Sequence, residues 1–137
     1  MKKAITILLA VVMTAAVVDV AVVAASASTT RAKTLSPTTI TISDYPKQVT
    51  VNETFNVTGR LTSSNNGISS AQVWHELYIA KNNVWRYRWV ITTDNDGYFS
   101  DSFSFTGPGT YKVRYEYNGN DQYSCCTSAE MVITAVS

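Results

Sequence analysis

The most constraining feature of this sequence is the segment Thr92–Tyr115, which contains a tight turn followed by two alternating runs. The turn is Asp94–Gly97, and Asn, Asp and Gly are the residues that tolerate the positive φ angles of a hairpin. In the next run aromatic residues alternate with polar ones, and Asp101 alone interrupts the apolar face. Such alternation is typical of a strand with one buried and one solvated side.

A corner and a second alternating strand follow. Gly107–Gly109 contains Pro108, which has no N–H to donate, so this segment ends the first strand. From Tyr111 to Tyr117 the apolar and charged residues again alternate. Two consecutive half-buried strands favour an all-β antiparallel sandwich over an α/β fold.

Further runs with strand character lie on both sides of this segment, and no long helical pattern follows residue 27. They are Thr38–Ser43, an edge segment at Val49–Val51, Thr54–Thr62, Ala71–Ala80, Val84–Thr93 and Met131–Val136. Together they predict a sandwich of about seven or eight strands over residues 38–137. Residues 28–37 hold few large apolar side chains and are predicted to form a flexible leader.

The N-terminus has the features of a signal peptide. Basic Lys2 and Lys3 precede the apolar run Ala4–Val18, and Ala25–Ala27 has the small-x-small form of a cleavage site. The run is shorter than the roughly 18 residues that span a bilayer, and Asp19 follows it. We therefore predict that residues 1–27 are a cleaved signal peptide, and that the chain contacts a membrane only if this segment is retained.

The charge balance argues against nucleic acid as a partner. The formal net charge of the full chain is +1, and removal of residues 1–27 makes the basic and acidic residues equal in number. A neutral chain lacks the long-range field that draws proteins to nucleic acid. We predict a secreted or cell-surface protein.

The run Thr38–Val136 resembles the immunoglobulin-like domains of bacterial and archaeal surface and adhesin-type proteins. The residues that carry the resemblance are Val57–Leu61, Thr93–Phe99, Gly107–Val113 and Tyr115–Tyr123. The resemblance implies an immunoglobulin-like fold with sheets A-B-E and G-F-C-C′. These motifs specify turns and core positions, so they imply a fold much more strongly than a ligand.

The resemblance also implies a core without a disulfide. In antibody-type domains a disulfide joins the second and sixth strands, and those positions correspond here to Val57 and Val113. The core of this domain is then expected to be held by apolar packing alone.

Cys125 and Cys126 are adjacent and have three interpretations. Adjacent Cα atoms lie about 3.8 Å apart, whereas disulfides favour roughly 4.4–6.8 Å, so a vicinal bridge would be strained. The alternatives are intermolecular pairing through an exposed thiol and two free thiols without a role. Two cysteines cannot make a zinc site, and the single histidine, His75, is expected to be a satisfied or half-buried side chain.

No metal, cofactor or catalytic site is predicted. Asp94–Gly97 resembles part of a calcium loop, but Thr92 and Phe103 stand where the first and last ligands belong. The acidic residues are expected mainly in turns or on solvated faces, and no nucleophile–base arrangement is evident. We therefore predict that the protein is not an enzyme.

One predicted sheet face could bind a ligand. If the apolar faces point inward, Trp74, Glu76 and Tyr78 point outward beside the basic residues Arg86, Arg88 and Arg114. Exposed aromatic rings beside guanidinium groups can stack on sugars or hold an acidic glycan. The alternative is that these residues are cross-strand pairs that stabilise an exposed face.

The predicted function is accordingly a secreted or surface-attached structural or adhesive module. The alternative is a carbohydrate-binding module that uses the aromatic and basic face. Cell-surface glycans or other surface proteins are the corresponding partners. Asn52 and Asn56 each begin a glycosylation sequon.

Overall fold

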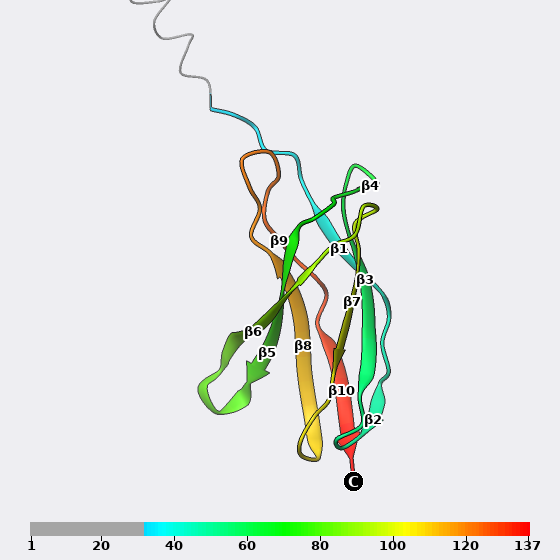
Figure 1. Cartoon of the computed structure of the whole chain (residues 1–137). Helices are drawn as coiled ribbons and strands as arrows, with labels where there is room; N and C mark the ends of the chain where they lie inside the picture. Colours follow the sequence, from blue (N-terminus) through cyan, green and yellow to red (C-terminus); the bar gives the residue numbers. More distant parts are fainter. Residues whose placement is uncertain (1–31) are drawn as a thin grey trace, which may run out of the picture. The chain divides into compact units, whose positions relative to one another are not determined.

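The computed structural model describes residues 32–137, of which Leu35–Ser137 form one compact all-β unit with two sheets (Figure 1). This agrees with the predicted β-sandwich class. The strands are β1 (Thr39–Asp44), β2 (Gln48–Thr50), β3 (Phe55–Ser63), β4 (Asn66–Gly67), β5 (Gln72–Ile79), β6 (Val84–Thr92), β7 (Tyr98–Phe103), β8 (Gly109–Tyr117), β9 (Cys126–Thr127) and β10 (Met131–Val136). The 3-10 turn η1 (Ala80–Asn82) closes the β5–β6 hairpin.

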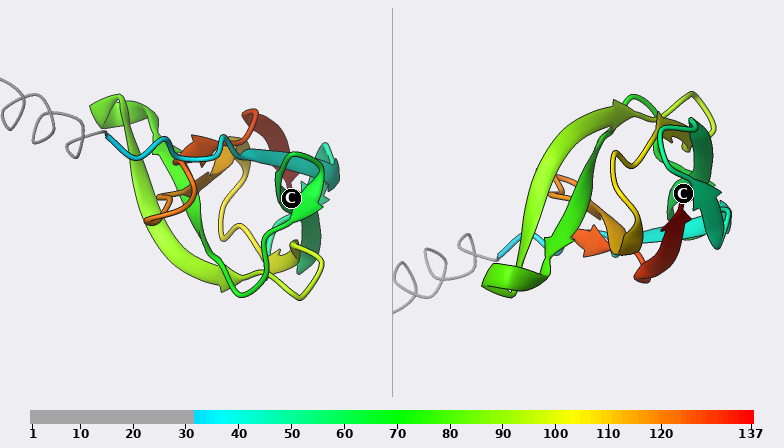
Figure 2. Two further views of the ribbon diagram at one scale, coloured as in Figure 1. Left: turned by 90° about the horizontal axis from the view of Figure 1, so that it is seen from above. Right: turned by 90° about the horizontal axis from the view of Figure 1, so that it is seen from below.

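The strands divide between a smaller and a larger sheet. The smaller sheet has the order β1-β3-β4, with β7 also paired to β3. The larger sheet has the order β2-β10-β8-β5-β6, with β9 also paired to β8. Views along the strands show the two sheets facing each other around the interior (Figure 2). The pairings are antiparallel except for β2, which runs parallel to β10 at the edge.

The interior is built by alternating strand residues. Along β3, Val57 and Leu61 are completely buried, and along β8 Val113 and Tyr115 are as well. Phe99 and Phe103 face the same interior from β7. Val57 and Val113 therefore both lie in the core, as expected. Burial of each such side chain stabilises the fold by about 1.5–3 kcal/mol relative to exposure.

A β-bulge in the β5–β6 pair overturns part of the predicted face assignment. The register shifts between His75 and Glu76, so that Trp89 lies opposite His75 and Tyr87 lies opposite Glu76. A one-residue shift reverses which side of the sheet each side chain occupies. Arg86 consequently lies opposite Leu77, on the inner side, and not beside Trp74 as predicted.

The turn that connects β6 and β7 forms as predicted. The side chain of Asp94 accepts hydrogen bonds from the backbone N–H groups of Asp96 and Tyr98, both at 2.9 Å. Gly97 has a φ angle of +83°, and its backbone lies against Gly67 of β4. These two glycines allow two backbone segments to approach more closely than side chains would permit.

The pairing begins earlier than the predicted domain boundary. Ser36, assigned to the flexible leader, forms a parallel bridge with Tyr123. Its N–H donates to the Gln122 carbonyl, and its own carbonyl accepts from the Ser124 N–H, both at 2.9 Å. The short strands β4 and β9 were also not predicted. The predicted signal peptide, residues 1–27, lies outside the described residues. Within residues 32–137, no helix has the length and apolar character needed to cross a membrane.

Candidate functional site

Three polar side chains are buried between the sheets, and a fourth, Trp89, reaches them from the edge strand β6 while remaining 36% exposed. Asp101 comes from β7 in the smaller sheet, whereas His75, Trp89 and Tyr115 come from β5, β6 and β8 in the larger one. One oxygen of Asp101, Oδ2, lies 2.7 Å from His75 Nδ1 and accepts a 2.8 Å hydrogen bond from the Tyr115 hydroxyl. The other oxygen accepts a 2.8 Å bond from the Trp89 indole N–H. We call these residues the Asp101 cluster.

Aromatic rings pack against the His75 ring of the Asp101 cluster. The Asp101 residue is only 4% exposed, and the His75 ring lies 4.1 Å from Trp89 and 4.6 Å from Phe103 between centroids. Burial, followed by the charge of Asp101 and its hydrogen bond, raises the pKa of Tyr115 well above its usual value. The phenol therefore remains a hydrogen-bond donor to the carboxylate throughout the ordinary pH range.

This arrangement suits cohesion between sheets better than chemistry on a substrate. A buried carboxylate needs partners to offset its loss of water, and here three donors from the opposite sheet provide them. Within residues 32–137, every fully buried side-chain polar atom has a hydrogen-bond partner. The expectation that acidic residues occupy mainly turns and solvated faces is therefore wrong for Asp101. The sequence did contain a signal for this buried carboxylate, because Asp101 is the one polar residue on the otherwise apolar face of β7.

The outer face of the larger sheet is the second candidate site. On it the Arg114 guanidinium stacks over the Trp85 ring at 4.2 Å, and Lys112 lies 5.3 Å from the Tyr78 ring centroid. Arg114 also donates to Glu76 at 2.6 Å, and Glu76 is buried beneath these side chains. Glu76 thus points to the outer face, as predicted, but neighbouring side chains shield it from solvent. The charged side chains of this face therefore contact side chains on neighbouring strands, through one ion pair, one hydrogen bond and cation–π contacts.

The structure brings together only some of the predicted ligand-binding residues. Trp74, Tyr78 and Arg114 share the outer face, as predicted. Arg86 lies on the other side of the sheet, and Arg88 lies at the bulge without a cross-strand partner. Sequence reasoning missed Trp85 and Tyr87, which take the places it gave to the two arginines. A strict period of two could not reveal them because the bulge resets the alternation.

The Tyr87 hydroxyl should lose its proton only at an unusually high pH. Its hydroxyl donates a 2.7 Å hydrogen bond to Glu116, and this contact, followed by burial, raises the pKa of Tyr87 to about 12. Because the folded pKa lies above the ordinary value, the contact's contribution to stability is full below about pH 10 and is lost as the pH rises through about 12.

The ultraviolet absorbance of phenolate, compared with that of a Tyr87→Phe variant, isolates this titration. We expect Glu116→Ala to move it back toward the ordinary value for tyrosine. An unchanged titration in Glu116→Ala would show that the hydrogen bond does not control the phenol.

A pocket of about 260 Å³ adjoins the outer face at Trp74. It lies between the segment before β5 and the loop after β8. Its lining is free of Lys, Arg, Asp and Glu and consists of Ile68, Ser69, Ser70, Ala71, Gln72, Trp74, Tyr117, Asn118, Gly119 and Asn120. The lining thus combines one large aromatic ring with hydroxyl and amide groups.

The two cysteines differ in environment. Both are free thiols in the structure; Cys125 is exposed, whereas Cys126 is half-buried and packs against the core. Burial raises the pKa of the Cys126 thiol above its usual value. Of the three interpretations, intermolecular pairing would use Cys125.

We expect iodoacetamide to alkylate Cys125 at least several-fold faster than Cys126 at neutral pH. The thiolate is the reactive form, and the Cys126 thiol is both less accessible to the reagent and harder to ionise. Peptide mapping by mass spectrometry after short labelling times measures the two rates. Equal rates would contradict the assigned environments. Failure of both thiols to react without prior reduction would instead indicate a bridge between them.

The remaining predicted positions lie on the surface. Asn52 is exposed in the turn after β2, and Asn56 is exposed on β3, where its amide oxygen accepts a hydrogen bond from Ser102. The Asp94 side chain accepts backbone hydrogen bonds within the β6–β7 turn. Among the described residues, no three His, Cys, Asp or Glu side chains lie close enough together to hold a metal ion.

Comparison with protein-family models and with curated proteins finds no match for this chain.

Proposed function

We propose that this protein is a secreted or surface-attached immunoglobulin-like module with a structural or adhesive role and no catalytic activity. The strand order supports the immunoglobulin-like assignment: β1-β3-β7 corresponds to A-B-E, and β10-β8-β5-β6 corresponds to G-F-C-C′. The observation that carries the functional proposal is the Asp101 cluster, in which the buried carboxylate and histidine join the two sheets. These buried groups hold the two sheets together, and the outer surfaces of the sheets remain available for contacts with a partner.

The location of the mature chain tests this proposal. A full-length chain with a C-terminal tag, expressed in its own host, should be recovered from the medium or the cell surface. Its N-terminus should lie near Ser28, because the small residues Ala25–Ala27 form the expected cleavage site. Recovery from the cell interior with Met1 retained would overturn the extracellular assignment.

A second candidate function, carbohydrate binding, is favoured by the position of Trp74. This ring lies both in the pocket and on the outer face, 5.4 Å from Tyr87 between ring centroids. A sugar stacked on Trp74 would find the amides of Gln72 and Asn118 beside it. Because the lining has no Lys, Arg, Asp or Glu and Arg114 is engaged with Glu76, the geometry favours a neutral sugar over an acidic glycan.

We expect Trp74→Ala to abolish saturable binding of the chain to neutral oligosaccharides on a glycan array. Trp85→Ala is the matched control, since it removes an outer-face tryptophan that does not line the pocket. If Trp85→Ala impairs binding as much as Trp74→Ala does, the pocket is not the binding site. If the unmodified chain binds no oligosaccharide, the carbohydrate function is excluded while the structural module stands.

A further inference from the structure

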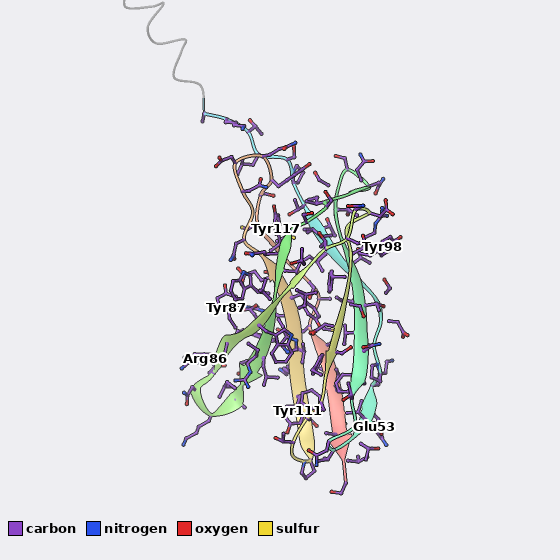
Figure 3. The ribbon with its side chains drawn as sticks, viewed as in Figure 1. Glu53, Arg86, Tyr87, Tyr98, Tyr111 and Tyr117 are labelled. Atoms are coloured by element: carbon purple, nitrogen blue, oxygen red, sulfur yellow. The ribbon has the colours of Figure 1, made fainter. Side chains whose placement is uncertain are left out.

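Strand β6 is a long free edge of the larger sheet. It is the terminal strand in the order β2-β10-β8-β5-β6, and its pairing is with β5 alone. Figure 3 labels Arg86 and Tyr87 on this strand, at the margin of the sheet away from β10. An edge strand presents N–H and C=O groups that can pair with another chain. At nine residues, β6 is as long as the central strand β8.

This edge is unusually apolar. Val84 is 36% exposed, Tyr87 53%, Trp89 36% and Val90 40%. Because Tyr87 and Val90 lie on the outer side and Val84 and Trp89 on the inner side, both sides of the strand offer apolar contacts. Exposed apolar surface gathered on one element is characteristic of an interaction site.

The charge of β6 indicates the chemistry of its partner. Arg86 and Arg88 are exposed, and neither forms an ion pair within residues 32–137. The strand itself contains no acidic residue, and Lys81 in the adjoining turn adds to the positive charge. A complementary partner strand would therefore carry acidic residues among its apolar ones.

A second copy of this chain fits the free edge of β6 less well than a peptide does. Antiparallel pairing of β6 with its own copy would bring the arginine pairs of the two chains close together, and like charges on paired strands are destabilising. The bulge at Arg88 also limits regular pairing to the part of the strand before it, Val84–Tyr87. A short extended segment suits this edge better than a long rigid strand from another sandwich.

We propose that β6 binds an extended peptide segment in which acidic residues alternate with β-branched or aromatic ones, and that this segment adds to the larger sheet as a strand. Backbone pairing along Val84–Tyr87 supplies general affinity, and Arg86 and Arg88 select for acidic side chains. The inference rests on the proposed adhesive role and names its partner class. It is independent of the carbohydrate pocket at Trp74.

Labelled peptides test this directly by fluorescence anisotropy with the full-length chain. The probes are a capped peptide of about eight residues alternating Val and Glu, its counterpart with Lys for Glu, and the acidic peptide with a central proline. We expect saturable binding of the acidic peptide and loss of binding with proline, which cannot donate to the strand ladder. The double variant Arg86→Glu/Arg88→Glu should weaken binding of the acidic peptide about tenfold and favour the basic one.

Lys47→Glu is the control, because it reverses an exposed charge outside β6 and should leave binding unchanged. Hydrogen exchange on the unsubstituted chain should slow in Val84–Tyr87 when the acidic peptide is present. Absence of saturable binding, equal binding of the proline peptide, or a dimer that Arg86→Glu/Arg88→Glu dissociates would overturn the proposal. None of these results changes where the protein is found, so they remain distinct from failure of the proposed function.

Discussion

Replacement of Asp101 by alanine should lower the free energy of unfolding by about 3–5 kcal/mol, a large part of the roughly 5–15 kcal/mol typical of a domain. The substitution removes the acceptor shared by His75, Trp89 and Tyr115. Their donors would remain buried or half-buried, and each unsatisfied buried donor costs about 1–3 kcal/mol. Chemical denaturation followed by circular dichroism measures the loss.

Two controls make this result specific to the Asp101 cluster. Asp101→Asn keeps the size of the side chain and one acceptor oxygen, so its loss should be smaller. In a double-mutant cycle, Asp101→Ala and Tyr115→Phe should be coupled by about 0.5–3 kcal/mol, whereas Asp101→Ala and Tyr98→Phe should be additive. A stability within about 0.5 kcal/mol of the unsubstituted chain for Asp101→Ala would exclude a cohesive role for the cluster.

Substitution of Gly97 by alanine should lower stability by about 2–4 kcal/mol, because it adds backbone strain to a steric clash. The residue has a φ angle of +83°, and an added Cβ would lie 2.4 Å from the carbonyl oxygen of Leu61. The same Cβ would lie 2.8 Å from the Cα atom of Gly67. These contacts are with backbone atoms and cannot be relieved by a rotamer change.

Gly107→Ala provides the matched comparison. An added Cβ there would approach nothing closer than 3.8 Å, the distance to the Tyr111 hydroxyl. We expect this variant to unfold within about 0.5 kcal/mol of the unsubstituted chain. Similar losses for the two alanine variants would indicate that the contact between the β6–β7 turn and β4 does not limit stability.

The sequence predicted most of the fold because alternation and turn chemistry are local signals. The last strand was placed at its observed bounds, Met131–Val136, and the Asp94–Gly97 turn was recognised from its composition. The strands β4 and β9 were missed because two residues are too few to show a period. Their pairing depends on the position of a longer neighbour.

The candidate sites were predicted less well, for two physical reasons. The bulge at Arg88 reversed the faces of one half of β6, and nothing in the local composition marks it. The partners of Asp101 are distant along the chain, so their meeting depends on the packing of two sheets. Only the polar interruption at Asp101 itself was visible in the sequence.

The most direct test of the cohesive role of the Asp101 cluster is indole hydrogen exchange by nuclear magnetic resonance. The N–H of Trp89 donates to a buried carboxylate of the opposite sheet, whereas the side chains of Trp74 and Trp85 lie on the outer face and form no hydrogen bond to that carboxylate. The indole proton of Trp89 should therefore exchange much more slowly than those of the other two, and Asp101→Ala should remove that protection. Equal exchange of all three indoles in the unsubstituted chain would contradict the account.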